Sequence, residues 1–326
     1  MMEFDRKSIR GWSMLGGCGT FGQIASELAK SDDDFAVVTA DLTFFSGLER
    51  LQKQKPDALY NFGIAEQNMI GAAAGMVKEG MKVFATTYAA FATTRCLDQV
   101  KVNMGYMRLP IKLVGLTAGY SVGILGATHM AMEDIAIMRS IPNIVILSPA
   151  DCTETAKAII AAYNCEDPVY IRLTGEHRSP IVYMQDYDFI IGKAIELTDG
   201  EDMALLATGT MVYECLQAKK ILENEGISCR VIDVHTIKPL DEQMLEKLNK
   251  MKLIVTVEEH SKIGGLGSGV AEFFADKISS PPQLIIAAPD SYPHAANYKT
   301  LLKNCGLTYD AIAEKVSNHY KKYYNL

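Results

Sequence analysis

The amino-acid sequence predicts an α/β protein of two domains. Apolar runs rich in β-branched residues alternate with helical patterns along most of its 326 residues. The apolar runs are continuous rather than alternating, which is typical of strands covered on both faces by helices. This alternation of strand and helix predicts mostly parallel sheets with helices on both faces. The chain is long enough for two domains that each bury a core.

The first half carries a regular series of predicted strands and helices. Asp151, which follows Ser148-Pro149-Ala150, is the predicted N-cap of the last helix in this series. The strands are expected at 35–40, 82–87, 111–117, 143–149 and 168–174, and the helices at 19–30, 65–79, 91–104, 129–139 and 151–163.

A stretch without clear periodicity separates this half from the next. Residues 176–191 are polar and aromatic, so we place a boundary near residue 185, which gives predicted domains 1–185 and 186–326. The second, smaller domain is expected to hold an α/β set of its own. Its strands are expected at 203–209, 228–234, 252–258 and 283–288, and its helices at 211–225, 240–249 and 266–277.

Composition and charge argue against several classes of protein. Hydrophobic residues make up 48% and charged residues 22%, and the net charge is -7 with no basic block that could follow a nucleic-acid backbone. No stretch approaches the ~20 apolar residues of a membrane span, and the N-terminal residues lack the apolar core of a secretory signal. The seven cysteines form no CxxC pair, which favours free thiols and a cytoplasmic location. We expect neither a nucleic-acid nor a membrane partner.

The most informative stretch for chemistry is the helix predicted at 65–79. The sequence passes from a strand end through Gly63 into a helix of small residues, with Glu66 in its first turn. One interpretation is structural, because a carboxylate at a helix N-terminus interacts favourably with the helix dipole. The other is functional, because α/β proteins bind ligands at the carboxyl ends of parallel strands and a carboxylate buried there suits proton transfer. The residues alone leave both open.

This helix resembles the signature helix of the pyrimidine-binding domain shared by transketolases, deoxyxylulose phosphate synthases and the β subunits of 2-oxo acid dehydrogenases. Further segments resemble that family in its order, and the second half resembles the transketolase C-terminal domain. These segments lie at 39–42, 88–91, 98–100, 126–129, 134–143, 148–151, 233–240 and 258–267. The resemblance implies that the chain is the pyrimidine-binding half of a transketolase-type enzyme.

The resemblance further implies that the cofactor is thiamine diphosphate. In the family, the glutamate that matches Glu66 hydrogen-bonds the aminopyrimidine ring nitrogen and helps to generate the nucleophilic thiazolium carbon. Phe91 and Tyr88 match the segment whose aromatic rings stack on the aminopyrimidine, although without the resemblance both would be interpreted as core residues. Asp41 and Ile64 belong to the matching segments and are expected to contact the cofactor.

The predicted substrate pocket departs from that of ordinary transketolases. His129, in a Gly-Ala-Thr-His turn, is expected to donate a hydrogen bond to a developing oxyanion, although a histidine alone is more simply explained as structural. Leu125, Thr117 and Phe45 stand where the family carries polar substrate contacts, and Arg10 matches a phosphate-binding arginine. An apolar pocket leaves a sugar hydroxyl unpaired at a cost of about 1 to 3 kcal/mol. We therefore expect non-standard sugar substrates.

The resemblance also implies a partner subunit. Transketolases hold the diphosphate and its divalent metal in a domain marked by Gly-Asp-Gly and Asn-Asn, and this sequence contains no such motif. We expect a split enzyme whose other subunit supplies that domain and binds Mg²⁺ or Ca²⁺ through the diphosphate, with no metal ligand from this chain. The expected assembly is a homodimer of this chain within a two-plus-two heterotetramer.

Three functional hypotheses follow from these expectations. The first is transfer of a two-carbon unit from a ketose or 2-oxo acid donor to an aldehyde or ketone acceptor. The second is a subunit that decarboxylates a 2-oxo acid or resembles deoxyxylulose phosphate synthase, for which Leu125 would suit the methyl group of pyruvate. The third is a non-catalytic regulatory or scaffold paralogue, which has little reason to retain Glu66.

Overall fold

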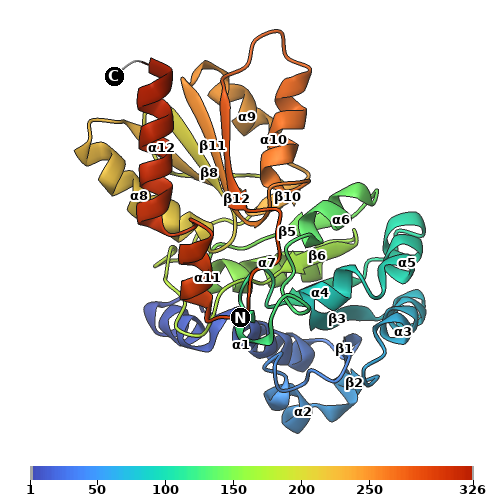
Figure 1. The fold of residues 1–326 in the computed structure, drawn as a ribbon. Coiled ribbons are helices and arrows are strands. Elements are labelled where there is room, and N and C mark those ends of the chain that lie inside the picture. The colour runs from blue at the N-terminus through green and yellow to red at the C-terminus, as the bar shows by residue number, and fades with distance from the viewer. Residues whose placement is uncertain (1–2, 325–326) are drawn as a thin grey trace.

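Two mostly parallel sheets, one built mainly from each half of the chain, organise the structure (Figure 1). The computed structural model describes residues 3–324. The first sheet has seven strands in the order β10-β5-β6-β4-β3-β1-β2, and the second has five in the order β12-β11-β8-β9-β7. Within the described residues, only β10 and β7 run antiparallel to the strand beside them. The predicted fold class is confirmed.

The first lobe is a sheet between two layers of helices. Phe35 and Val37 of β1 pack toward α1 and α7, whereas Val38 packs toward α3, because successive side chains of a strand point to opposite faces. The strands are β1 (Phe35–Thr39), β2 (Leu59–Asn61), β3 (Lys82–Tyr88), β4 (Lys112–Leu116), β5 (Val145–Leu147), β6 (Val169–Arg172) and β10 (Thr236–Lys238). The helices are α1 (Arg6–Ser31), α2 (Glu49–Gln54), α3 (Glu66–Lys78), α4 (Ala89–Thr93), α5 (Leu97–Val100), α6 (Asp134–Ser140) and α7 (Cys152–Asn164).

The second lobe repeats this layering on a smaller scale. Leu205 of β8 packs among residues of α8 and α12, and Leu206 packs toward α9 and α10. The strands are β7 (Ile195–Thr198), β8 (Met203–Ala207), β9 (Cys229–Asp233), β11 (Leu253–Ser261) and β12 (Gln283–Ala288). The helices are α8 (Met211–Asn224), α9 (Glu242–Lys247), α10 (Leu266–Ala275), α11 (Tyr298–Asn304) and α12 (Tyr309–Tyr324).

Three of the predicted helices differ from the structure. The helix expected at 19–30 is the second part of α1, which begins at Arg6 and kinks at Gly16. The helix expected at 91–104 is divided into α4, α5 and a π-helical turn (Lys101–Tyr106). The hydroxyls of Thr93 and Thr94 donate to the carbonyls of Ala89 and Ala90, and such bonds bend a helix and compete with its regular continuation. The helix expected at 129–139 begins only at Asp134, because Ala131 forms a β-bridge with Gly119. His129 therefore lies on a loop.

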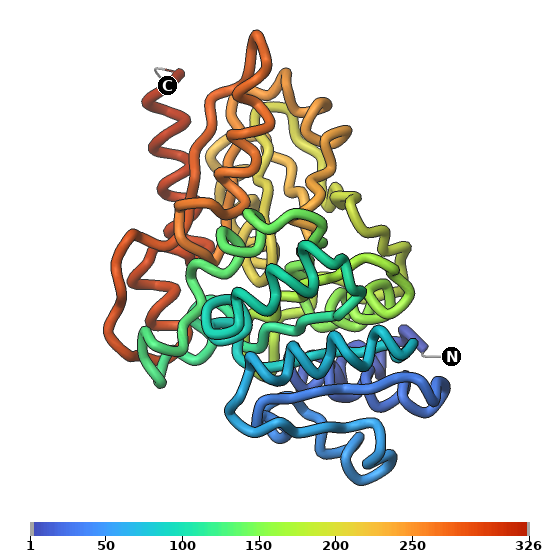
Figure 2. The backbone as a smooth tube through the Cα atoms, turned by 90° about the vertical axis from the view of Figure 1, so that its right-hand side faces the viewer, coloured from blue at the N-terminus to red at the C-terminus, as the bar shows by residue number. Residues whose placement is uncertain are grey.

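The two lobes share a sheet. β10 belongs to the second half of the sequence, yet it extends the first sheet by antiparallel pairing of Thr236 with Leu147. A second connection is made near Asn297, where the chain returns to the first lobe and the Ala296 amide donates to the carbonyl of Gly123 at 3.2 Å (Figure 2). The boundary near residue 185 falls in irregular backbone and stays a prediction.

Buried carboxyl groups lie where the lobes meet. The Tyr183 hydroxyl donates to Asp233 Oδ2 at 2.7 Å, and the Tyr187 hydroxyl donates to Glu154 Oε1 at 2.8 Å. The two tyrosine rings stack with centroids 4.1 Å apart. Burial raises the pKa of Asp233 to about 7 and also raises the pKa of Glu154.

This shift makes the free energy of unfolding dependent on pH. Between about pH 4 and 7 the native Asp233 carboxyl holds a proton that the unfolded carboxyl has released, so stability falls as the pH rises through that window. We expect the stability of the wild type relative to Asp233→Asn to fall by about 1.4 kcal/mol per pH unit there. Urea titrations at several pH values measure this difference. The exposed Asp199→Asn variant should track the wild type, and a flat difference for Asp233→Asn would contradict the assignment.

Candidate active site

The carboxyl ends of four adjacent parallel strands of the first sheet, β4, β3, β1 and β2, lie along one edge of it. The chain passes from β1 outward to β2 and then to β3 on the other side of β1, so the connections after β1 and β3 diverge. Such a point opens a crevice in which α/β proteins bind ligands. Asp41 follows β1 and Thr117 follows β4, with φ values of 60° and 50° that non-glycine residues rarely adopt. Backbone strain of this kind gathers at functional sites.

Glu66 lies in this crevice at the first residue of α3. Its side chain is 2% exposed. Nη1 of Arg95 contacts Oε1 at 2.9 Å and Oε2 at 3.0 Å, and the Thr87 hydroxyl donates to Oε1 at 3.4 Å. Ala65 at the N-cap offers no side-chain cap to this helix. The Glu66 carboxylate is thus buried and held by an arginine rather than exposed to solvent at a helix end.

Four aromatic rings from three segments gather near this carboxylate, and Arg95 links it to one of them, Phe91. Tyr88 lies at the end of β3, and its ring centroid is 6.0 Å from that of Phe91 and 6.1 Å from that of Phe45. The ring of His129 lies 5.3 Å from Phe91 and 5.9 Å from Tyr88. Burial raises the pKa of Tyr88. The cluster offers aromatic faces and one imidazole to a ligand in the crevice.

A cavity of about 500 Å³ opens next to the cluster. Phe45, Tyr88, Thr117 and Leu125 all line it, so the structure brings together these sequence-predicted residues. Phe45 is 57% exposed and Leu125 is 46% exposed, which gives the cavity two apolar walls.

The remaining predicted residues lie elsewhere. Asp41 is exposed and accepts a hydrogen bond from Asn61 Nδ2 at 3.3 Å, at the outer edge of the crevice. Ile64 is 76% exposed on the loop before α3. Arg10 is exposed on α1 and is not among the residues that line the cavity, so the structure does not bring it to the predicted substrate contacts.

The far wall of the cavity comes from the segment after β6. His177 donates its Nδ1–H to the Leu15 carbonyl at 2.7 Å, and Glu176 stands beside it. Close approach of this segment to α1 requires a glycine at position 16, where φ is 71° and a Cβ would lie 2.9 Å from the Glu176 carbonyl oxygen. Asn297 and Tyr298 of the second lobe complete the wall.

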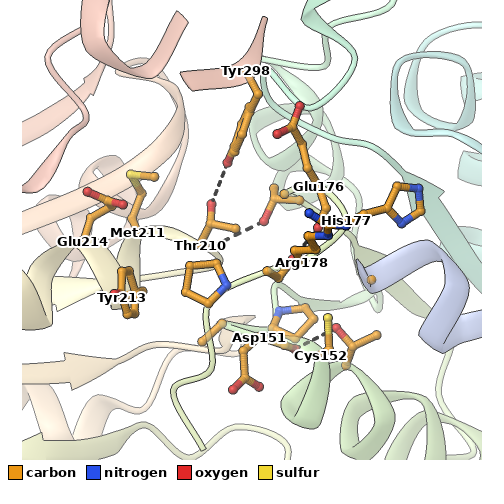
Figure 3. Close-up of a pocket in the computed structure, with 18 of the residues that line it drawn as sticks. Asp151, Cys152, Glu176, His177, Arg178, Thr210, Met211, Tyr213, Glu214 and Tyr298 are labelled. Atoms are coloured by element: carbon orange, nitrogen blue, oxygen red, sulfur yellow. Dashed lines mark hydrogen bonds between the residues drawn. The ribbon is translucent and has the colours of Figure 1, made fainter. Parts of the chain in front are cut away.

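A second cavity of about 280 Å³ adjoins the first through Gly175, Glu176, His177 and Tyr298 (Figure 3). It lies between the lobes, with Asp151 and Cys152 on one side and Thr210 on the other. The Thr210 hydroxyl lies 3.1 Å from the Tyr298 hydroxyl, and both contact the buried Glu259 carboxylate. Glu66, Phe91 and His129 line neither cavity. The aromatic cluster meets the first cavity through Phe45 and Tyr88, and it contributes no residue to the second.

Comparison with known proteins identifies the family. The model of the transketolase pyrimidine-binding domain matches residues 19–177, and that of the transketolase C-terminal domain matches residues 192–312. An apulose-4-phosphate transketolase subunit from Phocaeicola vulgatus is 36% identical over 93% of this chain and 97% of its own length. The 6-deoxy-6-sulfo-D-fructose transketolase subunit of a Clostridium species is 39% identical over 80% of this chain and 81% of its own length. This chain belongs to the transketolase family.

A solved structure of this family has the same architecture. It is described as a split gene transketolase, an inactive beta4 tetramer, and it superimposes with a TM-score of 0.82 at 34% identity over 92% of this chain and 96% of the other. The resemblance of the sequence to the transketolase pyrimidine-binding and C-terminal domains is confirmed. The roles of the individual site residues stay predictions.

The residues at this edge fit the aminopyrimidine of the family's cofactor, thiamine diphosphate. A protonated ring nitrogen needs a buried acceptor, which Glu66 provides, and a flat heterocycle needs an aromatic face, which the half-buried Phe91 provides.

In residues 3–324, no three His, Cys, Asp or Glu side chains gather so that they could hold a metal ion. The same residues contain no helix that is both long and apolar enough to cross a membrane.

Sequence reasoning missed several residues that contact Glu66 or line the first cavity. Arg95 pairs with Glu66, yet the two lie 29 residues apart and no local pattern links them. His177, Glu176 and Asn297 come from segments without helical or strand periodicity. Their polarity, and for Glu176 and His177 the preceding Gly175, are the signals that the sequence offers.

Proposed function

We propose that this chain is the pyrimidine-binding subunit of a thiamine-diphosphate-dependent transketolase. The reaction we infer transfers a two-carbon unit from a ketose or 2-oxo acid donor to an aldehyde or ketone acceptor. The observation that carries the proposal is the buried Glu66 carboxylate at the divergence of β1 and β3, linked to the Phe91 ring by the Arg95 guanidinium that contacts both. The chemistry supplied by the bound cofactor is a nucleophilic carbon that carries the two-carbon unit.

Each side chain has a defined task in this proposal. Glu66 accepts a hydrogen bond from the aminopyrimidine ring nitrogen and shares its proton. Phe91 and Tyr88 hold the heterocycle by stacking, and Ile64 and Asp41 border it. His129 lies in contact with both stacking rings, at 5.3 and 5.9 Å, and donates a hydrogen bond to the substrate oxygen on which negative charge develops.

We further propose that the substrates are non-standard sugars. Phe45 and Leu125 give the cavity apolar walls, which cannot hydrogen-bond the hydroxyls of an ordinary ketose phosphate. Relatives named for apulose 4-phosphate and for 6-deoxy-6-sulfo-D-fructose support unusual sugars as a class. We retain Thr117 and His129 as substrate contacts, whereas Arg10 lies on α1 outside the cavity.

A separate subunit is proposed to hold the diphosphate and Mg²⁺. Two relatives named as transketolase subunits match this chain over 97% and 81% of their own lengths, which supports a divided enzyme. We propose a two-plus-two heterotetramer in which this chain forms the central homodimer. All seven cysteines are free thiols, which supports a reducing, cytoplasmic location.

Calorimetric titration of thiamine diphosphate with Mg²⁺ tests the divided site. We expect tight binding to the mixture of this chain and its partner, and binding to this chain alone that is weaker by at least about a hundredfold, because the diphosphate contacts are then missing. Tight binding to the lone chain would mean that the diphosphate site is misplaced. Absence of binding in both samples would favour the scaffold hypothesis.

The second candidate function is 2-oxo acid decarboxylation. The exposed apolar side chains of Phe45 and Leu125 in the cavity would suit the methyl group of pyruvate. A donor screen with ketoses and pyruvate separates the two candidates by product. Release of carbon dioxide from pyruvate with no transfer from any ketose would replace the transketolase proposal.

A further inference from the structure

Arg95 makes two contacts that the cofactor is proposed to make. Its Nη1 contacts both oxygens of Glu66, at 2.9 and 3.0 Å. Its guanidinium carbon lies 3.9 Å from the centroid of the Phe91 ring. A guanidinium is planar and carries N–H donors, as a protonated aminopyrimidine does. One flat cationic group therefore stacks on the proposed stacking ring and hydrogen-bonds the proposed catalytic carboxylate.

The Arg95 side chain is partly exposed, whereas its backbone is held by hydrogen bonds. Its side chain is 43% exposed, whereas that of Glu66 is 2% exposed. The Arg95 carbonyl accepts a hydrogen bond from Gln67 Nε2 at 3.1 Å, and its amide donates to the Phe91 carbonyl at 3.2 Å. These bonds hold the turn between α4 and α5 against the start of α3, so a change of side-chain rotamer is sufficient to free the carboxylate.

We propose that Arg95 occupies the place of the aminopyrimidine in the unliganded subunit and is displaced when thiamine diphosphate binds. This inference rests on the proposed function. The arginine prevents Glu66 from being a buried charge without a partner, which is strongly unfavourable. Cofactor binding must then replace both the ion pair and the stacking contact. Arg95 therefore competes with the cofactor for Glu66 and Phe91, and it is not a contact of the cofactor in the assembled enzyme.

Arg95→Met tests this proposal, because methionine keeps much of the side-chain length and removes the charge and the planar donors. Thiamine diphosphate with Mg²⁺ is titrated by calorimetry into the complex of this chain with its partner subunit. We expect Arg95→Met to bind the cofactor roughly tenfold more tightly than the wild type. This factor corresponds to a wild-type site that Arg95 leaves free in about one molecule in ten. The surface variant Arg108→Met should leave the affinity unchanged.

Arg95→Lys is a second variant that keeps a positive charge near Glu66. Lysine lacks the flat surface that stacks on Phe91, so it should also bind the cofactor more tightly than the wild type. Unchanged or weaker binding by both variants would overturn the proposal, and weaker binding would make Arg95 a contact of the assembled site. Failure of the wild-type complex to bind the cofactor would instead overturn the proposed function.

A stability measurement on the lone chain gives an independent readout. Arg95→Met should lower the thermal midpoint, because Glu66 then loses its cationic partner, and the double variant Arg95→Met/Glu66→Gln should restore it. The Glu66→Gln complex is expected to bind thiamine diphosphate weakly whatever stands at position 95. A double variant as unstable as Arg95→Met would show that Arg95 serves the fold rather than the carboxylate.

Discussion

Replacement of Glu66 by glutamine should abolish turnover of the assembled enzyme while the fold is retained. Glutamine keeps the size of the side chain and can still accept from Thr87, but it cannot share a proton with a ring nitrogen. We expect kcat to fall by about 10³-fold, within the range of rate factors that a positioned acid or base contributes. Two-carbon transfer is measured with the best donor from the screen, and circular dichroism follows the fold.

The matched control for this variant is Glu79→Gln, at the other end of the same helix. Glu79 is exposed at the C-cap of α3, so its replacement should leave kcat within about twofold of the wild type, as expected for a surface substitution. A Glu66→Gln enzyme with full activity would remove Glu66 from the catalytic assignment.

Replacement of Arg172 by methionine should strongly destabilise the protein. Arg172 is 1% exposed and Asp134 is 0% exposed, and Nε of the arginine lies 2.8 Å from Oδ2 of the aspartate. The same guanidinium donates to the Glu259 carbonyl of the second lobe at 2.6 Å. Removal of one partner leaves a buried charge unpaired, so we expect the free energy of unfolding to fall by about 3 to 5 kcal/mol.

Urea denaturation measures this loss. The control is Arg108→Met, because Arg108 pairs with Asp167 at the surface, where the two side chains are 61% and 49% exposed, and a pair of this kind contributes less than about 1 kcal/mol. The double variant Arg172→Met/Asp134→Asn should recover part of the loss, since it removes the unpaired charge. A loss for Arg172→Met no larger than that of Arg108→Met would show that the buried pair does not stabilise the junction.

Most of the secondary structure could be predicted because its signals are local. The buried runs at 35–40 and 203–209 contain β1 and β8, and the run at 82–87 covers β3 up to its last residue, Tyr88. The Asp151 carboxylate accepts from the Glu154 amide at 2.8 Å, which confirms the predicted N-cap of α7. β2, β7 and β10 were not predicted, because these strands of three or four residues lack the longer apolar run that marks the equally short β5.

The site could be predicted only where the residues themselves carry the resemblance. Glu66 and Phe91 stand in segments whose spacing marks the family. The contact of Arg95 with Glu66 depends on the turn between α4 and α5, which holds the guanidinium at the carboxylate. The continuous helix that we expected here would not have contained this turn. A hydrogen bond to the carbonyl of Leu15, 162 residues away in the sequence, holds His177 at the cavity wall. A contact between such distant residues has no local signal in the sequence.

The strand β10 has a consequence for any attempt to divide the molecule. A fragment ending near residue 185 would keep β5 but lose the strand that pairs with it, so the backbone N–H and C=O groups of Val145–Leu147 would form an open sheet edge. Open edges invite pairing with a strand of another chain and hence aggregation. The other fragment would carry β10 with no sheet to join. We therefore expect that the two lobes must be encoded, expressed and purified together as a single chain.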